Sequence, residues 1–551
     1  MFVAMVHYPG LLPASVVLSF IMNCSLVPLT QAVPTPGPKA WASRRVSAIV
    51  ADGAAALERG DTVAAKNLFR RALALDATNV AAHTYLGIVA DRADDLVEAE
   101  RQFASAAKAA PSSPEARNNH GAILLRMGRK REAAAEFESS LHLNRKQPAA
   151  LVNLAQIYFA SGTAAGMQNA RDLFRRAGDL APDAEIARAL VLIALRLGES
   201  EQAIAEYPEY SAHLGSAPKS VTAPSARADL GAALFEAKLF KEATAELTAG
   251  VAGDPADPAK VVLLARAYQE QKDFPAAGRA LESAVARGME AAPVYAALAE
   301  VYEASGHIEN AIPAMRRAIQ LDPKRESYRF RYAMLLTDSN APQAAVIRLQ
   351  EALEEFPHSA MLWFALGVAQ FTDNKNDEAA KAFSRALEQD SKMAPALAYL
   401  GMIRVDQGKT ADAVGFYERA LALDEESSTI QYLQSEALVK LTPPDNNAAE
   451  AHLKRAIVLE PSLQQAHLQL GKLYMRTERM DEAARELEGV IRVDPNRAEA
   501  YYQLGRVYAR LKKREAAQAA MAKFEELSQA EKKQSENERR DMVHRLANVR
   551  F

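Results

Sequence analysis

The sequence predicts an all-α solenoid of stacked helix-turn-helix units, and three observations predict it. The same local pattern returns every 34 residues along most of the chain, which is typical of repeat architectures. Within each period, apolar residues recur at helical spacing. Alanine is abundant while aromatic residues make up only 7%, which favours closely packed helices over sheets.

The composition is that of an ordinary folded protein. Hydrophobic residues make up 49% and charged residues 25% of the 551 residues, which excludes wholesale disorder and a polytopic membrane protein. The 66 basic and 69 acidic residues give a formal net charge of −3, so no global charge favours nucleic acid or an anionic membrane. The single cysteine, Cys24, excludes a disulfide framework within the chain and a cysteine-based zinc site.

The first residues have the pattern of an export segment. Residues 11–29 are apolar and uncharged, and Thr30-Gln31-Ala32 offers small residues where a signal peptidase reads them. We therefore expect a signal peptide or anchor over 1–32, a Pro-rich linker over 33–45, and a protein exported to a bacterial periplasm or anchored in the membrane. No Lys or Arg precedes Leu11, so a mis-called start codon and a cytoplasmic protein are the alternative.

The 34-residue period has a physical explanation in helix packing. It separates Gly87 from Gly121, Gly367 from Gly401, Gly471 from Gly505, Pro323 from Pro357 and Pro461 from Pro495. Small residues at fixed points let two antiparallel helices approach closely, and proline ends the second helix because it cannot continue the hydrogen-bond ladder. One such pair cannot bury its apolar face alone, so neighbouring pairs must stack.

These positions resemble those of tetratricopeptide repeats. The segment Tyr85-Leu86-Gly87…Ala99…Phe103…Ala106…Pro111 carries most of the family's diagnostic positions. The resemblance implies a right-handed superhelix in which the first helix of each pair lines an inner groove. We expect repeats to begin near Val46, Val80, Pro114, Pro148, Ala184, Pro224, Pro258, Ala292, Glu326, Ala360, Ala394, Ser428, Gln464 and Ala498.

The repeats are expected to form two arrays. The second helix of the fifth repeat meets Pro208 and is expected to end there, so residues 208–223 are interpreted as a break between an N-terminal array (46–207) and a C-terminal array (224–531). Residues 532–551 are highly charged and are expected to form a capping helix or a frayed tail.

Motifs of catalysis are missing from the sequence. Gly408-Lys409-Thr410 resembles the end of a phosphate-binding loop, but Ile403 stands where the earlier glycine is required, so we interpret the triplet as a turn. His83 and His467 fall at the fourth position of their repeats and are expected to be packed or half-buried rather than ligands. The sequence therefore predicts a non-enzyme without cofactor or metal.

The resemblance also implies which residues face the groove, namely positions 2, 5, 6, 9, 12 and 13 of each repeat. Near the N-terminus these positions include an amide zone, Asn118, Asn119, Asn153 and Gln156. Asn119 and Asn153 both occupy position 6, which resembles the start of an asparagine ladder that grips the backbone of an extended peptide. The equivalent Tyr85 and Asp229 depart from this pattern.

The groove positions near the C-terminus are basic, after an acidic middle zone. This predicted basic wall consists of Lys440, Lys472, Arg476, Arg506 and Arg510, with Tyr502 among them. Such a wall suits an acidic peptide, because charge-assisted hydrogen bonds to carboxylates are strong. The alternative is that these cations pair with acids on adjacent helices or are solvated.

The function that follows is that of a scaffold or adaptor holding protein or peptide partners in the groove, with no nucleic-acid partner and a membrane contact only through the N-terminal segment. In an exported protein, this scaffold could serve assembly of an envelope or secretion complex. Two alternatives are a substrate-recruiting subunit of a protein-modifying glycosyltransferase and a chaperone-like carrier.

Overall fold

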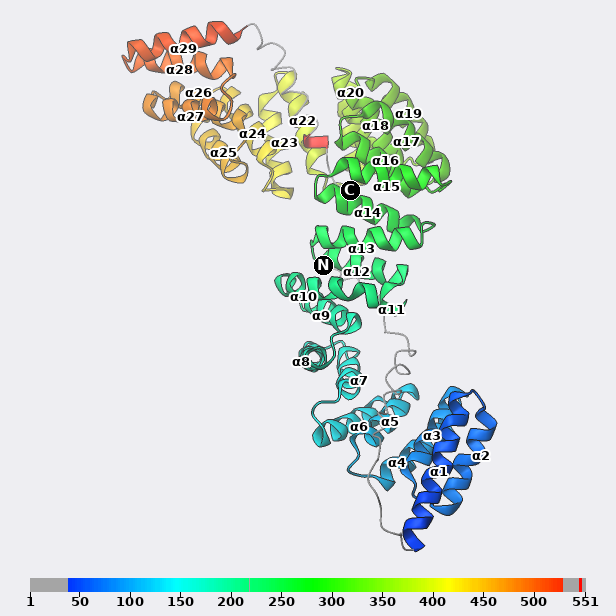
Figure 1. Ribbon diagram of the computed structural model, residues 1–551. Coiled ribbons are helices and arrows are strands. Elements are labelled where there is room, and N and C mark those ends of the chain that lie inside the picture. The colour runs from blue at the N-terminus through cyan, green and yellow to red at the C-terminus, as the bar shows by residue number, and fades with distance from the viewer. Residues whose placement is uncertain (1–37, 218, 529–544, 548–551) are drawn as a thin grey trace. The chain divides into compact units, whose positions relative to one another are not determined.

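The computed structural model describes residues 38–217, 219–528 and 545–547. In these ranges the regular structure is entirely helical, with α1 to α29 arranged as successive pairs (Figure 1). The all-α repeat fold is thus confirmed. The chain divides into two compact units, an N-terminal unit up to Met289 and a C-terminal unit from Glu290.

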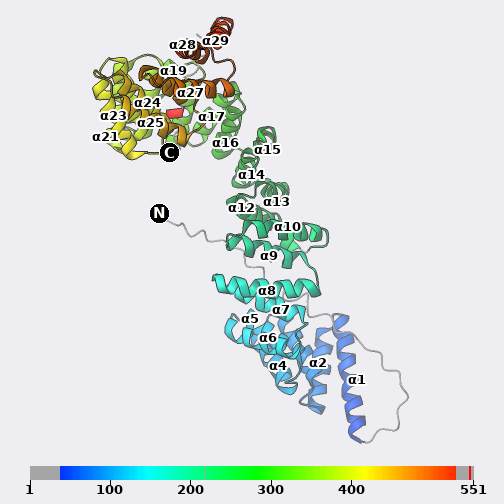
Figure 2. The same ribbon diagram turned by 90° about the vertical axis from the view of Figure 1, so that its left-hand side faces the viewer.

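The helices of the N-terminal unit, with the 3₁₀ helix η2 (Leu214–Ser216), are α1 (Pro38–Glu58), α2 (Thr62–Leu75), α3 (Val80–Arg92), α4 (Leu96–Ala109), α5 (Pro114–Arg126), α6 (Lys130–Leu143), α7 (Pro148–Phe159), α8 (Ala164–Leu180), α9 (Ala184–Arg196), α10 (Ser200–His213), α11 (Lys219–Thr222), α12 (Pro224–Glu236), α13 (Phe240–Gly253), α14 (Pro258–Glu270) and α15 (Phe274–Ala286). Figure 2 shows these pairs following one another along the unit.

The helices of the C-terminal unit are α16 (Ala292–Ala304), α17 (Ile308–Leu321), α18 (Glu326–Asp338), α19 (Pro342–Glu355), α20 (Ala360–Thr372), α21 (Asn376–Gln389), α22 (Ala394–Asp406), α23 (Thr410–Leu423), α24 (Ser428–Lys440), α25 (Asn446–Leu459), α26 (Gln464–Arg476), α27 (Met480–Val493), α28 (Ala498–Arg510) and α29 (Arg514–Leu527).

The predicted repeat starts coincide with helix starts from the second repeat onward. Every one of those predicted residues, from Val80 to Ala498, is the first residue of a helix. The first repeat differs, because α1 begins at Pro38 rather than near Val46. Proline is tolerated in the first turn of a helix, where its missing N–H would have no partner. Residues 38–45, expected in the linker, are therefore helical.

The pair α22–α23 shows why the sequence forms these units. A Cβ on Gly401 of α22 would lie 2.5 Å from the ring of Tyr417 in α23, so the glycine makes room for that buried aromatic side chain. Gly408 has φ +72° and turns the chain between the two helices. The interpretation of Gly408-Lys409-Thr410 as a turn is thereby confirmed.

A side chain at the fourth position of a repeat often fixes the preceding loop. In five repeats it bonds to the carbonyl oxygen six residues earlier, at 2.9–3.2 Å. These side chains are His83, Arg329, Trp363, Gln431 and His467. The two histidines are thus half-buried packing residues, as predicted.

Within each unit, the first helices of successive pairs lie side by side. In the N-terminal unit, α3 contacts α5 and α5 contacts α7. In the C-terminal unit, α18 contacts α20, and α24 contacts both α22 and α26. The second helices approach their counterparts less closely. The first helices therefore form the inner row of each unit, where repeat proteins bind their partners.

The segment expected to break the array differs from the prediction. Helix α10 continues through Pro208 to His213 instead of ending at the proline, and the boundary between the compact units falls between Met289 and Glu290 in the sequence. Proline removes one hydrogen bond and bends a helix, and tertiary contacts can offset that cost.

Those contacts are made by a buried carboxylate in α13. Glu246 is fully buried and accepts hydrogen bonds from the hydroxyls of Tyr207 at 2.7 Å and Tyr210 at 3.0 Å. Arg227 of α12 donates two more, one of them at 3.0 Å. We call Tyr207, Tyr210, Arg227 and Glu246 the Glu246 cluster. It connects α10 to α12 and α13 across residues 214–223.

None of the helices in the described ranges is long and apolar enough to span a membrane. The predicted signal peptide or anchor over 1–32 lies outside the described residues, as does most of the predicted capping segment over 532–551.

Candidate protein-binding surface

The inner row of the C-terminal unit carries an apolar surface over α20, α22 and α24. We call it the apolar strip, and it consists of Phe364, Phe371, Tyr399, Tyr432 and Leu433. All five occupy positions 5, 6 or 12 of their repeats, which the family resemblance assigned to the groove. Each is less than 9% exposed, so something covers a surface that repeat proteins normally present to a partner.

Tyr399 lies at the centre of the strip. Its ring lies 5.9 Å from that of Phe364 and 5.5 Å from that of Phe371, both at edge-on angles. Phe383 of α21 stacks on it at 4.8 Å. Such aromatic pairs stabilise a core by about 0.5–1.5 kcal/mol beyond burial of their area.

The strip carries no charge at physiological pH. Burial raises the pKa of Tyr399 well above its ordinary value, and the charge of Asp338 raises it further. Burial likewise raises the pKa of Tyr432, with Glu436 adding to the effect. Both hydroxyls therefore remain protonated, and the surface suits an apolar side chain.

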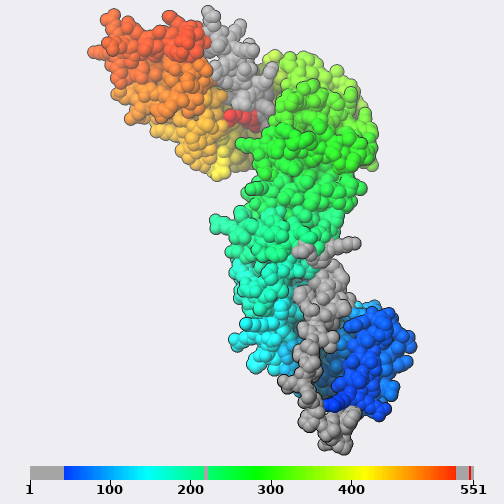
Figure 3. Space-filling model, viewed as in Figure 1, coloured from blue at the N-terminus to red at the C-terminus, as the bar shows by residue number. Residues whose placement is uncertain are grey.

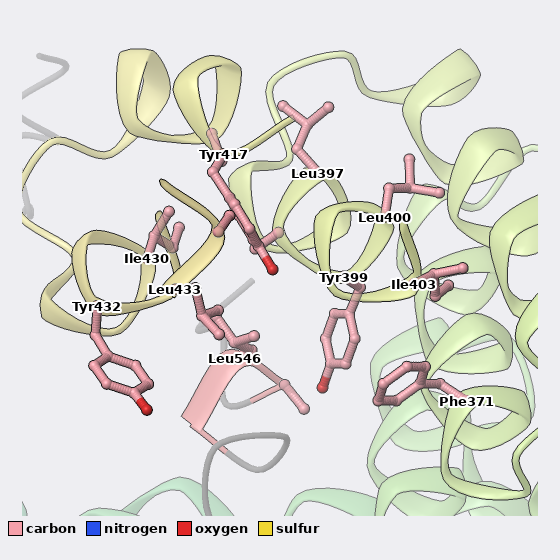
Figure 4. Close-up of a cluster of buried hydrophobic side chains, with 14 of the residues drawn as sticks. Phe371, Leu397, Tyr399, Leu400, Ile403, Tyr417, Ile430, Tyr432, Leu433 and Leu546 are labelled. Carbon is pink, nitrogen blue, oxygen red and sulfur yellow. The ribbon is translucent and has the colours of Figure 1, made fainter. Parts of the chain in front are cut away.

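Leu546, in the described segment 545–547, lies against the strip (Figure 4). Leu546 is 4% exposed and Ala547 is 3% exposed, and both belong to the same core cluster as the five strip residues. Figure 4 shows Leu546 in the space between Tyr399 on one side and Tyr432 and Leu433 on the other. In Figure 3 the small red group of residues 545–547 lies apart from the orange-red helices α28 and α29.

A charged contact fixes the edge of this interface. Arg545 donates a hydrogen bond to Glu460 Oε1 at 2.7 Å. Ser428, the first residue of α24, donates to the other carboxylate oxygen at 2.7 Å. Burial acts to raise the pKa of Glu460, but the hydrogen bonds from Arg545 and Ser428 outweigh it and lower that pKa. Glu460 is therefore a charged acceptor already oriented toward the segment.

The predicted basic wall is placed on α24, α26 and α28, and most of its cations have structural partners. Lys472 forms an ion pair with Glu499. Arg506 donates to Gln503 at 3.2 Å and lies over the ring of Tyr502, which packs against Phe524. Lys440 is exposed.

The arginines at position 13 cap the helix of the preceding repeat. Arg476 donates to the carbonyl oxygen of Val439 at 3.4 Å and to Asn446. Arg510 donates a hydrogen bond to the carbonyl oxygen of Met475 at 3.3 Å. The last carbonyl groups of a helix have no partner within it, so these side chains satisfy them. A role for the wall in acidic-peptide binding stays a prediction, and these contacts favour the alternative of pairing within the protein.

The predicted amide zone lies on α5 and α7 of the N-terminal unit. Asn153 is buried, while Asn118, Asn119 and Gln156 are half-buried. The Oδ1 atom of Asn118 is buried without a hydrogen-bond partner in the protein. Peptide binding by this zone also stays a prediction.

Sequence reasoning missed the apolar strip, although α20 contains a signal for it. Residues 360–372 read Ala-Met-Leu-Trp-Phe-Ala-Leu-Gly-Val-Ala-Gln-Phe-Thr, with no charge on any side. A helix that is apolar all round is buried on all sides, so its groove face must be covered. No comparable pattern identifies residues 545–547, which lie in a charged stretch.

In the described ranges, no group of three or more His, Cys, Asp and Glu side chains is arranged to hold a metal ion.

Family comparisons identify the repeats. Tetratricopeptide repeat models match residues 56–121, 119–185, 292–325, 330–394, 396–429, 445–504 and 498–531. The matches extend over both units, and the chain therefore belongs to the tetratricopeptide repeat proteins.

Individual relatives match only in part. Anaphase-promoting complex subunit 3 of Schizosaccharomyces pombe is 25% identical over 191 residues, which cover 34% of this chain and 28% of that protein. The human protein O-mannosyl-transferase TMTC3 is 27% identical over 198 residues, or 35% of this chain and 22% of that protein. The matches thus span less than a third of either relative.

A solved structure of an APC/C hetero-tetramer, Cut9–Hcn1, is similar over 85% of this chain and 98% of that chain, with 14% identity and a TM-score of 0.39.

Proposed function

We propose that the chain is a non-catalytic scaffold that binds segments of partner proteins on the inner row of its C-terminal unit. The observation that carries the proposal is the apolar strip, an uncharged surface at groove positions that already holds a short chain segment. Its arrangement, an aromatic centre with a charged residue at the edge, is that of protein-binding hot spots.

The mode of binding that fits the strip is a helix in a groove. Residues 545–547 are helical and present Leu546 and Ala547 to the strip, while Arg545 reaches Glu460 at the edge. Apolar anchors on one helical face and a polar rim characterise this mode. The exposed Lys440 and the cations of α26 and α28 would extend the site toward acidic segments of a partner.

Site-specific photocrosslinking tests the proposal. Met402 and Val439 are partly buried and pack against the strip's core cluster, so a photoreactive residue at either position is expected to crosslink a partner protein. Matched probes at the exposed Val458 and Val493 of α25 and α27 are expected to give no such product. Equal yields from the two pairs of positions would contradict binding on the inner row.

Charge reversal tests the extension toward acidic segments. The triple variant Lys472→Glu, Arg476→Glu and Arg506→Glu is expected to reduce partner recovery in a pull-down. Unchanged recovery, with circular dichroism confirming the fold, would remove the basic wall from the site.

The likeness to TMTC3 favours one second candidate, a subunit that recruits substrates for a protein-modifying glycosyltransferase. A purified chain that transfers sugar without another protein would contradict both functions, since each assigns catalysis elsewhere. Transfer that depends on adding this chain to a separate glycosyltransferase would favour the second candidate.

We further propose that the protein is exported in a bacterium and serves an envelope or secretion complex. The support is residues 11–32 of the sequence, with their apolar run and small residues at the cleavage site. Mass spectrometry of the mature N-terminus tests this, and a chain that retains Met1 and fractionates with the cytoplasm would contradict it.

A further inference from the structure

We propose that residues 545–547 are a built-in ligand that closes the apolar strip, and that a partner opens it by presenting the same chemistry. That chemistry is a helical turn in which a basic residue is followed directly by leucine and alanine. This inference rests on the proposed function, because it assigns the partner's chemistry at the same surface.

The contacts have the features of a ligand in its site rather than those of one more repeat. Leu546 and Ala547 are almost fully buried, yet they follow the last described repeat helix, α29, which ends at Leu527. They pack beside α22 and α24 instead of adding a layer to α29 (Figures 3 and 4). The pairing of Arg545 with Glu460 joins residues 85 positions apart.

The receiving surface is complete without the segment. Tyr399 is held by Phe364, Phe371 and Phe383, and Glu460 is held by Ser428. Groups held in this way lose little conformational freedom when a ligand binds, which favours affinity. A segment from another chain would therefore meet a site that needs no rearrangement beyond departure of residues 545–547.

The sequence that leads to the segment is long and mostly polar. Sixteen residues lie between Ser528 and Arg545, and an extended chain of that length spans at most about 60 Å. Residues 531–541 read Glu-Lys-Lys-Gln-Ser-Glu-Asn-Glu-Arg-Arg-Asp, without an apolar residue, and Met542 and Val543 follow them. Among the described residues of the segment, Leu546 and Ala547 supply the apolar contact.

Tethering sets the size of the expected effect. A short linker gives a ligand an effective concentration on the order of 1 mM. A segment that binds in trans with a Kd of roughly 0.1 mM would then occupy its site about nine-tenths of the time and weaken a competitor about tenfold.

The test uses a fluorescent peptide with the sequence of residues 540–551 and full-length protein. Fluorescence anisotropy is expected to show the peptide binding to Leu546→Asp about tenfold more tightly than to wild type, because the variant's own segment no longer covers the strip. Val493→Asp, a matched change at an exposed position, is expected to behave as wild type. A peptide carrying the same Leu→Asp change is expected not to bind.

A second pair of changes tests the charged contact. Arg545→Glu in the full chain is expected to open the site less than Leu546→Asp does, and Glu460→Gln combined with Leu546→Asp is expected to weaken peptide binding severalfold. Glu388→Gln, which affects an exposed ion pair with Arg385, is the control for the loss of a carboxylate.

Three results would overturn the inference. The first is equal peptide affinity for wild type and Leu546→Asp. The second is no binding to Leu546→Asp when circular dichroism shows it folded. The third is a wild-type dimer that becomes a monomer on Leu546→Asp, since the segment would then be exchanged between copies. Partner crosslinking at Met402 and Val439 is read separately: if it persists while the peptide fails, the inference fails and the proposed function stands.

Discussion

The Glu246 cluster and the apolar strip both bury side chains that a plain repeat would not require, but they do so in different ways. Glu246 is covered by four hydrogen bonds from Tyr207, Tyr210 and Arg227, all within the folded N-terminal unit. The strip packs in one cluster with Leu546 and Ala547, which follow α29, the last helix of the described repeats. The first arrangement strengthens the scaffold, and the second leaves a surface that can be uncovered.

The difference lies in what each region loses when its cover is removed. A buried carboxylate without its partners carries an uncompensated charge, which is costly. An uncovered apolar surface loses only the free energy of burying a few side chains. The two regions should therefore respond to mutation on different scales.

The largest expected effect is that of Glu246→Ala. The substitution leaves Arg227, whose side chain is 17% exposed, without its counter-ion. The free energy of unfolding of the N-terminal unit is therefore expected to fall by about 3–5 kcal/mol. Hydrogen exchange of the α10, α12 and α13 amides measures it. Glu209→Ala, an exposed carboxylate of α10, is expected to stay within about 0.5 kcal/mol of wild type. A loss of less than 1 kcal/mol for Glu246→Ala would show that the cluster is not a structural element.

A smaller loss of stability is expected at a feature that the two regions share, a glycine packed closely against a side chain of the paired helix. A Cβ on Gly231 in α12 would lie 2.7 Å from Leu247, and one on Gly401 in α22 would lie 2.5 Å from Tyr417. Gly231→Ala and Gly401→Ala are therefore each expected to cost about 1–3 kcal/mol by overpacking. Denaturant unfolding followed by circular dichroism measures both costs.

The control for these variants is a glycine with free space around it. A Cβ on Gly415 of α23 would meet nothing within 4 Å, so Gly415→Ala is expected to stabilise the helix by up to about 1 kcal/mol. Equal losses at all three glycines would mean that helix-pair packing does not explain the 34-residue period.

The smallest effect concerns two histidines at the same repeat position in the two units. His83 Nδ1 lies 2.7 Å from the neutral amide of Gln102, whereas His467 Nδ1 lies 2.7 Å from the carboxylate of Glu486. The hydrogen bond to Glu486 raises the pKa of His467, although burial opposes the shift. A raised folded-state pKa stabilises the fold fully below about pH 6.5, and this stabilisation is lost as the pH rises through the folded-state pKa.

The contribution of His467 is expected to stay below about 1 kcal/mol, because the pair is partly solvated. Glu486→Gln is expected to lower the pKa of His467 in an NMR titration and to flatten the pH dependence of C-terminal-unit stability between pH 6 and 8. An unchanged pKa in Glu486→Gln would assign the shift to another group.

The helical repeats could be predicted from sequence because their causes are local. Glycine, alanine and proline recur at fixed spacing, and each acts on its own helix or on the next. The continuation of α10 through Pro208 could not be predicted, because Glu246 lies 38 residues farther along the chain. Local propensity at the proline is outweighed there by tertiary hydrogen bonds.

The candidate site was less predictable for the same reason. The resemblance assigned the groove positions to the first helices, but the amide zone and the basic wall were selected by residue type alone. Arg476 and Arg510 show the weakness of that selection, since both cap neighbouring helices. The strip depends on a contact between α22–α24 and Leu546, and no repeat spacing relates such distant segments.

The separation in sequence between the strip and Leu546 has a consequence for the order of synthesis. The last strip residue, Leu433, leaves the ribosome 113 residues before Leu546. At about 5–20 residues per second, that interval is on the order of ten seconds. During this interval, Tyr399 and its neighbours face water on a nascent chain, where an exposed apolar surface binds chaperones or another nascent chain. The protein is therefore most prone to aggregate in the interval before Leu546 has been synthesised.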